Sequence, residues 1–179
     1  MNQTDKMLAV NFERTPIFEF GNQSFIPVDL GLPSGRKWAN RNVGAKSEDD
    51  CGYMMDFDTA NGIEFQDGWH VPSPEDFKEL VANCESEWTL QNGVPGRVFK
   101  SKINGNSIFL PAAGWSWFDK KDELDYGTTL NVRGTYGSYW SSGFSSASNA
   151  YSLSFSSADV IPQDDYGGRR LGLTVRAVQ

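Results

Sequence analysis

The side chains that could carry out chemistry in this sequence are few, and they form no familiar catalytic pattern. His70 is the only histidine, so a Ser-His-Asp triad would have to use it, and no Gly-x-Ser-x-Gly nucleophile turn accompanies it. A Cys84–His70 dyad is conceivable, but Cys84 falls on the apolar stripe of a predicted helix, where a thiol is normally inert packing. We therefore expect His70 to be an ordinary turn residue and predict no catalytic residue.

Acidic residues are more numerous and occur in the groups 48–50, 56–58 and 164–165. Spacing along one chain does not show two carboxylates held across a cleft, which glycoside hydrolysis requires. The stretch "DFDTANG" is similar to a calcium loop, but its ligand series breaks and no Glu closes it. Asp56 and Asp58 are thus only a weak metal pair, and we predict solvated acidic faces with no metal and no cofactor.

The two cysteines cannot form a four-ligand zinc site by themselves. Two buried, free thiols at Cys51 and Cys84 are the favoured interpretation, because such thiols behave as small apolar residues. A disulfide between them is the alternative.

Composition and charge limit the class of protein. Hydrophobic residues make up 39% and aromatic residues 13% of the 179 residues, which is too rich for a disordered chain. The 18 glycines and 6 tryptophans favour a turn-rich β or α+β domain. A net charge of −7 without a basic cluster argues against nucleic-acid binding and against an anionic membrane surface.

The sequence shows no segment that targets or inserts it into a membrane. No apolar run approaches the roughly 18 residues of a membrane span, and residues 1–16 lack the basic and apolar regions of a signal peptide. We expect a cytoplasmic location for the chain as given, or display as part of a phage or surface assembly.

The clearest predicted helix begins after Ser73. Ser73 suits the N-cap, Pro74 suits the first helical position, and the following acidic residues face the positive end of the helix dipole. We expect the helix to end between residues 84 and 87, and a second, shorter helical turn to follow Ser47. The apolar stripe of the first helix is formed by Phe77, Leu80, Val81, Cys84 and Trp88.

Elsewhere the patterns predict strands and turns. Residues 17–31 suggest a hairpin around Gly21-Asn22, and "SIFLPAAGW" is a short buried run that Pro111 ends. In the serine-rich tract 139–168, apolar residues alternate with serines, which predicts a strand with one buried and one wet face. The apolar residues of that strand and of the last one are Tyr151, Leu153, Phe155, Leu171, Leu173, Val175 and Ala177.

The second half of the chain differs in charge and composition. Residues 1–123 carry 19 acidic and 12 basic side chains, whereas residues 124–179 carry four of each. Tyr, Ser, Gly, Asn and Asp dominate residues 134–170, which is typical of recognition loops. A merely polar sheet face is the alternative. We interpret the chain as one domain whose second half does a different job.

Six motifs in order resemble the major paralogous domain (FISUMP) family of gut Bacteroidetes, over Val28 to Val178. They are "VDLGLPSGRKWANRNVGA", "GWHVPSPEDFKELVANC", "NGNSIFLPAAGW", "GTYGSYWSSG", "NAYSLSFSS" and "GLTVRAV". The resemblance implies an α+β, C-type-lectin-like fold of the formylglycine-generating-enzyme type, made of mostly antiparallel strands. Residues 28–179 would form this domain, and residues 1–27 an added strand or assembly arm through which copies associate as a homo-oligomer.

A related use of that fold is the variable protein of diversity-generating retroelements, including phage receptor-binding tips. The resemblance then implies a fixed scaffold that carries a variable surface within residues 134–171. The expected scaffold comprises Gly137, Tyr139, Trp140, Ser141, Ser142, Ala150, Leu153, Phe155, Gly172, Val175 and Arg176. The expected ligand-binding, diversified positions are Gly143, Phe144, Ser145, Ala147, Asn149, Tyr151, Asp159, Ile161, Asp164, Asp165, Tyr166, Gly167 and Arg169.

The function that this resemblance implies is recognition or adhesion without turnover. The ligand would be an unknown protein or glycan on a cell surface, with Phe144 and Ile161 as contact anchors. The chain has "IPQDD" and "WSS" where calcium-dependent lectins carry their sugar site, so calcium-dependent sugar binding is not supported. Two alternatives stay open: an enzyme of the formylglycine-generating or carbohydrate-active kind, which requires an occupied metal or a reactive Cys84, and a structural surface or appendage protein.

Overall fold

The computed structural model of the chain describes residues 20–117 and 130–179. Within these ranges the strands form antiparallel sheets that two complete helices accompany, so the predicted α+β class is confirmed. The helices are α3 (Phe57–Asn61) and α4 (Pro74–Asn83). The strands are β1 (Pro27–Asp29), β2 (Lys37–Ala39), β3 (Cys84–Gln91), β4 (Val94–Ser101), β5 (Ser107–Pro111), β6 (Trp115–Trp117), β7 (Leu130–Asn131), β8 (Gly137–Phe144), β9 (Asn149–Phe155), β10 (Val160–Gly168) and β11 (Leu171–Gly172).

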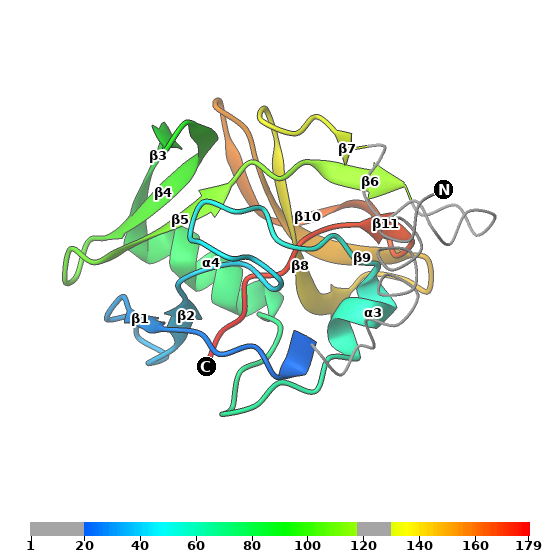
Figure 1. Cartoon of the computed structure of the whole chain (residues 1–179), viewed down its shortest axis with the longest axis horizontal. Helices are drawn as coiled ribbons and strands as arrows, with labels where there is room; N and C mark the ends of the chain where they lie inside the picture. The colour runs from blue at the N-terminus through cyan, green and yellow to red at the C-terminus, as the bar shows by residue number, and fades with distance from the viewer. Residues whose placement is uncertain (1–19, 118–129) are drawn as a thin grey trace, which may run out of the picture.

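The strands are arranged in three three-stranded sheets and one pair. Their orders are β10-β9-β8, β11-β6-β7 and β3-β4-β5, with β1 paired to β2. The C-terminal segment crosses the middle of the domain and joins these sheets (Figure 1). Its Thr174 lies beside Tyr139 of β8 in a parallel bridge, and its Val178 bridges both Trp38 of β2 and His70. The polar groups of this central segment are therefore held by strands from distant parts of the sequence.

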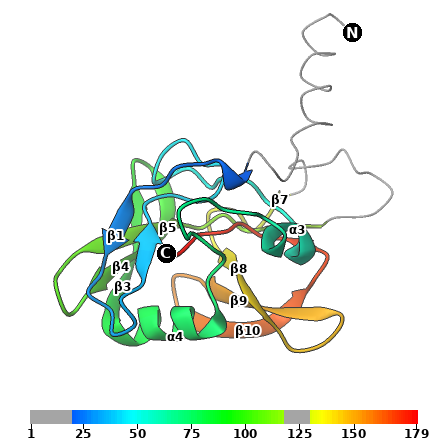
Figure 2. The same ribbon diagram turned by 90° about the horizontal axis from the view of Figure 1, so that it is seen from below.

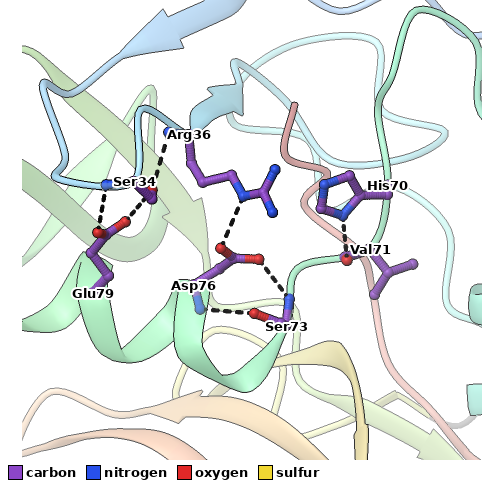
Figure 3. A network of polar contacts seen from close by, with 7 residues as sticks. All are labelled: Ser34, Arg36, His70, Val71, Ser73, Asp76 and Glu79. Atoms are coloured by element: carbon purple, nitrogen blue, oxygen red, sulfur yellow. Dashed lines mark hydrogen bonds and ion pairs between the residues drawn. The ribbon is translucent and has the colours of Figure 1, made fainter.

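Helix α4 begins where the sequence predicts. The Ser73 hydroxyl accepts a hydrogen bond from the Asp76 amide at 3.1 Å, and the Asp76 carboxylate accepts one from the Ser73 amide at 2.8 Å. This reciprocal capping box satisfies two amides that the first turn leaves without a helical partner (Figure 3). Phe77 and Leu80 are fully buried on its inner face.

The outer side of α4 holds the turn that precedes β2. The Glu79 carboxylate accepts bonds from the Ser34 amide and hydroxyl at 2.9 and 2.5 Å, and Arg36 forms an ion pair with Asp76 at 3.2 Å. Figure 3 shows these side chains of the helix and the turn pointing toward one another. The helix is thus fixed by packing on one side and by polar contacts on the other.

The helix ends at Asn83 with Cys84 as its C-cap, close to the predicted end, but the predicted apolar stripe does not continue to Trp88 as a helix. Cys84 begins β3, which pairs with β4 along its whole length. Residues Asn92 and Gly93 close this hairpin with φ of 50° and 81°, the left-handed conformation of a tight two-residue turn. Pairing across this turn overrides the helical spacing, and Trp88 is a strand residue.

Two other predicted elements differ from the structure. The predicted hairpin at Gly21-Asn22 is not formed in the described residues: residues 20–21 are helical, β1 pairs with β2, and residues 17–19 lie outside the described part. A single turn follows Ser47, closed by the Asp50 amide and the Ser47 carbonyl at 3.3 Å, but the helix that follows is α3, where the Asp56 carboxylate accepts a bond from the Thr59 amide at 2.7 Å. The N-cap of this helix is therefore Asp56, nine residues after Ser47. Residues 107–111 do form the predicted buried strand.

The serine-bearing side of β9 is buried, contrary to prediction. Ser152 and Ser154 are only 2% and 1% exposed, and Ser154 lies 3.3 Å from both Ser152 and Ser138, oxygen to oxygen. The strand alternates as predicted. Its serine face, which the alternation predicts to be exposed to water, is instead covered by other parts of the chain. The same holds for the last segment, where Thr174 and Arg176 are fully buried.

Two hydrophobic cores lie on opposite faces of the β10-β9-β8 sheet. On one face Tyr139, Leu153 and Phe155 pack with Phe77 and Leu80 of α4. On the other face Trp140 and Ala150 pack with residues of α3 and the C-terminal segment. The view in Figure 2 places α4 and α3 apart on either side of these strands. The sheet is thus held rigidly in the middle of the domain.

Candidate functional site

The register of the β10-β9-β8 sheet decides which residues share its α3-side face. Residues directly opposite each other in an antiparallel sheet point to the same side. The partners of Ala150, Ser152 and Ser154 are Phe144, Trp140 and Ser138 on β8, and Gly167, Asp164 and Ile161 on β10. From one of these pairs to the next, β10 advances by three residues and β9 by two, so β10 contains two β-bulges. Ile161, Asp164 and Gly167 consequently lie on one face, although strict alternation would separate them.

One end of this face presents an exposed aromatic ring. The Phe144 side chain is 57% exposed and meets Phe57 of α3 edge-on, with ring centroids 6.2 Å apart. The guanidinium carbon of Arg169 lies 5.2 Å from the Phe144 centroid and 4.7 Å from the Phe57 centroid, which is cation–π distance. Arg169 also forms an ion pair with Asp58. Phe144 is therefore held in place while its surface stays open to a partner.

Backbone and side-chain hydrogen bonds order the tip of the β8–β9 hairpin beside this ring. The Arg169 amide donates to the Ser148 carbonyl at 2.8 Å, and the Ser145 hydroxyl donates to the Asp165 carboxylate. The Asn149 side-chain amide donates to the Asp165 carbonyl at 3.4 Å. The tip thus carries exposed polar groups on a backbone that β10 fixes.

The other end of the face borders a groove of about 520 Å³. Its polar groups meet where the Tyr136 hydroxyl donates to the Asp164 carboxylate at 3.3 Å. Burial raises the pKa of Tyr136. The described lining residues are Trp115, Val132, Thr135, Tyr136, Ile161 and Asp164. The groove is open and mainly apolar, with a few polar groups at its edge.

A strained turn positions the wall of this groove. Val132 adopts φ of 54°, a left-handed conformation that a β-branched residue rarely takes. Its carbonyl accepts bonds from the Thr135 and Tyr136 amides at 3.1 and 3.0 Å. Sequence reasoning missed Trp115, Val132 and Tyr136, because they come from other segments and meet Ile161 and Asp164 only in the folded domain.

The predicted surface positions do not form one patch. Phe144 lies at one end of this sheet face and Ile161 and Asp164 at the other, and the buried Trp140, Ser152 and Ser154 separate the two ends. Asp159 lies in the β9–β10 turn, where it accepts a bond from Ser156 at 2.6 Å. Tyr151 is half-buried. It lies on the opposite, α4-side face together with Leu153, because alternate residues of a strand point to the same side. The exposed predicted residues are Phe144, Ser145, Ala147, Asp159, Ile161 and Asp165, and the half-buried ones are Gly143, Asn149, Tyr151, Asp164 and Arg169. The side chain of Tyr166 lies outside the described part.

Two predicted surface positions are wrong as freely variable sites. Gly167 is buried, because it backs onto the indole of Trp140. A Cβ at Gly143 would lie 2.5 Å from Pro74, so a larger side chain there requires the helix start to move. The expected scaffold residues are buried except for Ser142.

The residues that could serve catalysis or metal binding make structural contacts instead. His70 pairs its backbone with Val178, and its ring nitrogen lies 2.9 Å from the Val71 carbonyl. Asp56 caps α3, and Asp58 pairs with Arg169. In residues 20–117 and 130–179, no three His, Cys, Asp or Glu side chains converge on a cation site.

Both cysteines are free thiols, so the disulfide is wrong. Cys84 is buried as predicted, whereas Cys51 is half-buried. Burial raises the pKa of Cys84 to about 11. A catalytic thiol needs the opposite, a lowered pKa beside a cation or a helix N-terminus. The enzyme alternative requires a reactive Cys84, and the surroundings of this thiol do not activate it.

The Cys84 thiol should make the protein less stable as the pH rises. In the unfolded chain this thiol ionises near the ordinary cysteine pKa of 9.0, whereas the folded thiol keeps its proton until about pH 11. Between these values the folded state binds more protons, so the free energy of unfolding should fall by up to about 1.4 kcal/mol per pH unit. Urea unfolding at pH 8 and pH 10.5 measures this fall. Cys84→Ala should show a smaller fall, and an equal one would contradict the prediction.

No helix in the described ranges is both long enough and apolar enough to span a bilayer. Comparison of the chain with family models, with curated proteins and with solved structures gives no significant match. Function must therefore be argued from the sheet face and its two ends.

Proposed function

We propose that this chain is a ligand-binding module that displays exposed apolar anchors and polar groups at the two ends of a rigid sheet. The observation that carries the proposal is the register of β10, which places Ile161 and Asp164 on the same face as Phe144. Phe144 and Ile161 are 57% and 41% exposed. Exposed apolar side chains within a polar surface are the usual centres of protein recognition.

Rigidity beneath this face supports a recognition role. Trp140 lies on this face between its two exposed ends, where it is fully buried, and its indole nitrogen donates to the Met55 carbonyl at 2.7 Å. A surface that is ordered before binding loses less entropy on binding. The exposed hairpin tip is rich in serine, whose hydroxyls adapt their hydrogen bonds to different partners.

We infer a C-type-lectin-like fold and a retroelement-diversified surface as the finer form of this proposal. The pairing of Lys37 with Gln179, amide to carbonyl at 3.0 and 2.9 Å, closes the domain by joining an early strand to the C-terminus. The codons of the exposed positions test the diversification. A nearby, near-identical DNA repeat that differs only at adenines in those codons would support it, and its absence from the encoding genome would refute it.

Replacing both anchors should weaken binding to the natural ligand. We expect the Phe144→Ser, Ile161→Ser variant to lose at least about fivefold in affinity for each anchor, because buried anchors at interfaces contribute more than about 1 kcal/mol each. A cell-surface and glycan array probed with the labelled protein identifies the ligand, and biolayer interferometry measures the affinity.

Leu90 provides the matched control. It is 65% exposed at the β3–β4 hairpin, away from this face. Leu90→Ser should bind as the wild type does. Equal loss from Leu90→Ser, or none from the double variant, would count against recognition through this face, and a stable fold that binds nothing on either array would favour the structural alternative.

A further inference from the structure

Strand β3 is an edge of the β3-β4-β5 sheet (Figure 1), and its register with β4 decides which of its backbone groups point outward. Just before the ladder begins, the Asn83 carbonyl accepts a bond from the Lys102 amide at 3.0 Å. In an antiparallel pair, residues that bond to the neighbouring strand alternate with residues whose groups face away from it. Because β3 pairs with β4 without a break, Ser86, Trp88 and Leu90 face away from β4.

These outward groups are open within residues 20–117 and 130–179. In these ranges no strand other than β4 pairs with β3, and the amides of Ser86, Trp88 and Leu90 have no backbone partner. The Ser86 carbonyl accepts a side-chain bond from the Arg97 guanidinium at 3.4 Å. Residues 85–87 and Leu90 are exposed, so a further strand can reach this edge.

The other long edges of the described sheets are interrupted, and β3 is not. Short length, proline and bulges protect natural sheet edges from pairing with other chains. β10 contains two bulges and Pro162, and β5 ends at Pro111 while Arg176 bonds its Phe109 carbonyl. β3 has eight residues, no proline and no bulge. Such an edge accepts an extended peptide through main-chain hydrogen bonds.

The charge of this edge indicates what kind of strand it accepts. Glu85 and Glu87 lie on the same side of β3, and neither forms an ion pair within the described part of the chain. Lys100 faces Glu85 across the ladder, whereas Glu87 faces Val98. A second copy would bring the same two carboxylates and a net charge of −7 to the edge. Basic residues of a different protein are complementary to it instead.

We propose that β3 binds an extended segment of a protein partner, in which basic residues alternate with β-branched ones, as an additional antiparallel strand. The backbone groups of Ser86, Trp88 and Leu90 would bond to it, and Glu85 and Glu87 would each lie opposite a Lys or Arg. These two glutamates occupy the non-hydrogen-bonded positions of the new pair, where opposite side chains are closest. This inference goes beyond the proposed function and does not depend on it.

A pair of peptides tests the charge. Acetyl-Thr-Val-Lys-Val-Lys-Val-amide is titrated into the whole protein at low salt, and the matched peptide has Glu in place of both Lys. We expect saturable binding of the lysine peptide. The glutamate peptide should bind at least about tenfold more weakly, because it replaces two opposite-charge pairs by two like-charge pairs.

Hydrogen exchange followed by NMR tests whether the lysine peptide adds as a strand. The Trp88 amide points outward and should exchange at least about tenfold more slowly when the peptide is saturating. The Glu87 amide already faces β4 in the ladder, so its exchange should change much less.

Variants of Ser86 test the outward backbone. Ser86→Pro removes the outward amide but keeps the β3–β4 bonds, because an edge strand tolerates proline where the N–H faces solvent. It should weaken binding at least about tenfold. Ser86→Ala is the matched control: it also loses the hydroxyl that accepts a bond from Arg97 at 2.9 Å, but it keeps the amide and should bind within about twofold of the wild type.

A second set of variants tests the carboxylates. Glu87→Gln should weaken binding of the lysine peptide about threefold. Glu64→Gln, at an exposed position after α3, is the control and should have no effect. Amide spectra of every variant check that the fold is kept. If Ser86→Pro does not fold, a lysine peptide N-methylated at its first valine, opposite Trp88, makes the same test from the other side.

Equal binding of the two peptides, an unprotected Trp88 amide, or full binding of the N-methylated peptide would overturn the proposal. A wild-type dimer in analytical ultracentrifugation that Ser86→Pro dissociates would assign the edge to a second copy and overturn it as well. The Phe144→Ser, Ile161→Ser variant should bind the lysine peptide as the wild type does. The strand-addition site and the proposed recognition function can therefore fail separately.

Discussion

Replacing Arg176 by alanine is expected to lower the free energy of unfolding by about 3–5 kcal/mol. Arg176 is fully buried and donates to the Asn42 side chain at 2.7 Å and to the Ala39 and Phe109 carbonyls at 3.1 and 2.8 Å. Truncation leaves these three acceptors buried without a donor. Burial lowers the pKa of Arg176 to about 10, so the side chain still carries its charge at neutral pH.

The loss should extend beyond the arginine, because Asn42 links it to a second buried group. The Asn42 amide donates to the Tyr139 hydroxyl at 3.2 Å, which in turn donates to the Pro111 carbonyl at 2.7 Å. Thermal unfolding should show a midpoint about 10 °C lower, at roughly 2–4 °C per kcal/mol for a chain of this size. Arg170→Ala, at an exposed position, is the control and should change the midpoint by less than about 2 °C. A similar small change in Arg176→Ala would contradict the argument.

Replacing Trp140 by alanine is expected to cost about 3–5 kcal/mol as well. The indole fills the core between α3 and the sheet, meets Phe57 edge-on at a centroid distance of 5.6 Å, and donates to the Met55 carbonyl. Its loss leaves a cavity between α3 and the sheet. Trp140→Phe keeps a ring but loses the hydrogen bond, and it should cost about half as much. Urea unfolding measures both values.

The same experiment tests whether the surface varies independently of the scaffold. Substitutions at Ser145 and Ala147, both exposed, should change the free energy of unfolding by less than about 0.5 kcal/mol. The Phe57 amide donates to the Arg169 carbonyl at 3.0 Å. Because Trp140→Ala removes the ring that packs against Phe57, this amide should exchange its hydrogen faster in the variant. If surface substitutions destabilise the protein as much as Trp140→Ala does, a variable surface on a fixed core is refuted.

Several features of the fold could be predicted from the residues alone because local interactions determine them. The start of α4 follows from Ser73, Pro74 and the acid at Asp76, whose capping contacts lie within four residues. The buried strand at 107–111 follows from its apolar run. The α+β class follows from the mixture of one strong helix signal with many short strand signals. Such predictions succeed where neighbouring residues supply both partners of the interaction.

The switch from α4 to β3 at Cys84 cannot be predicted from local interactions alone. The stripe from Phe77 to Trp88 satisfies helical spacing, yet the strand from Cys84 onward gains a complete ladder of hydrogen bonds with β4. That gain depends on residues 94–101, which the helical pattern does not include. Tertiary pairing therefore decides between two structures that the local sequence permits.

Sequence alone determined that Phe144 and Ile161 lie in a serine-rich, nearly neutral tract, and that the chain has no familiar catalytic or cofactor motif. Only the tertiary structure decided how they are grouped. Two bulges in β10 turn Ile161 and Asp164 to the same side, and Trp115 and Tyr136 arrive from other segments to build the groove. The physical reason is that alternation along one strand fixes the direction of a side chain only while the register is regular. What covers each face depends on layers from distant parts of the chain.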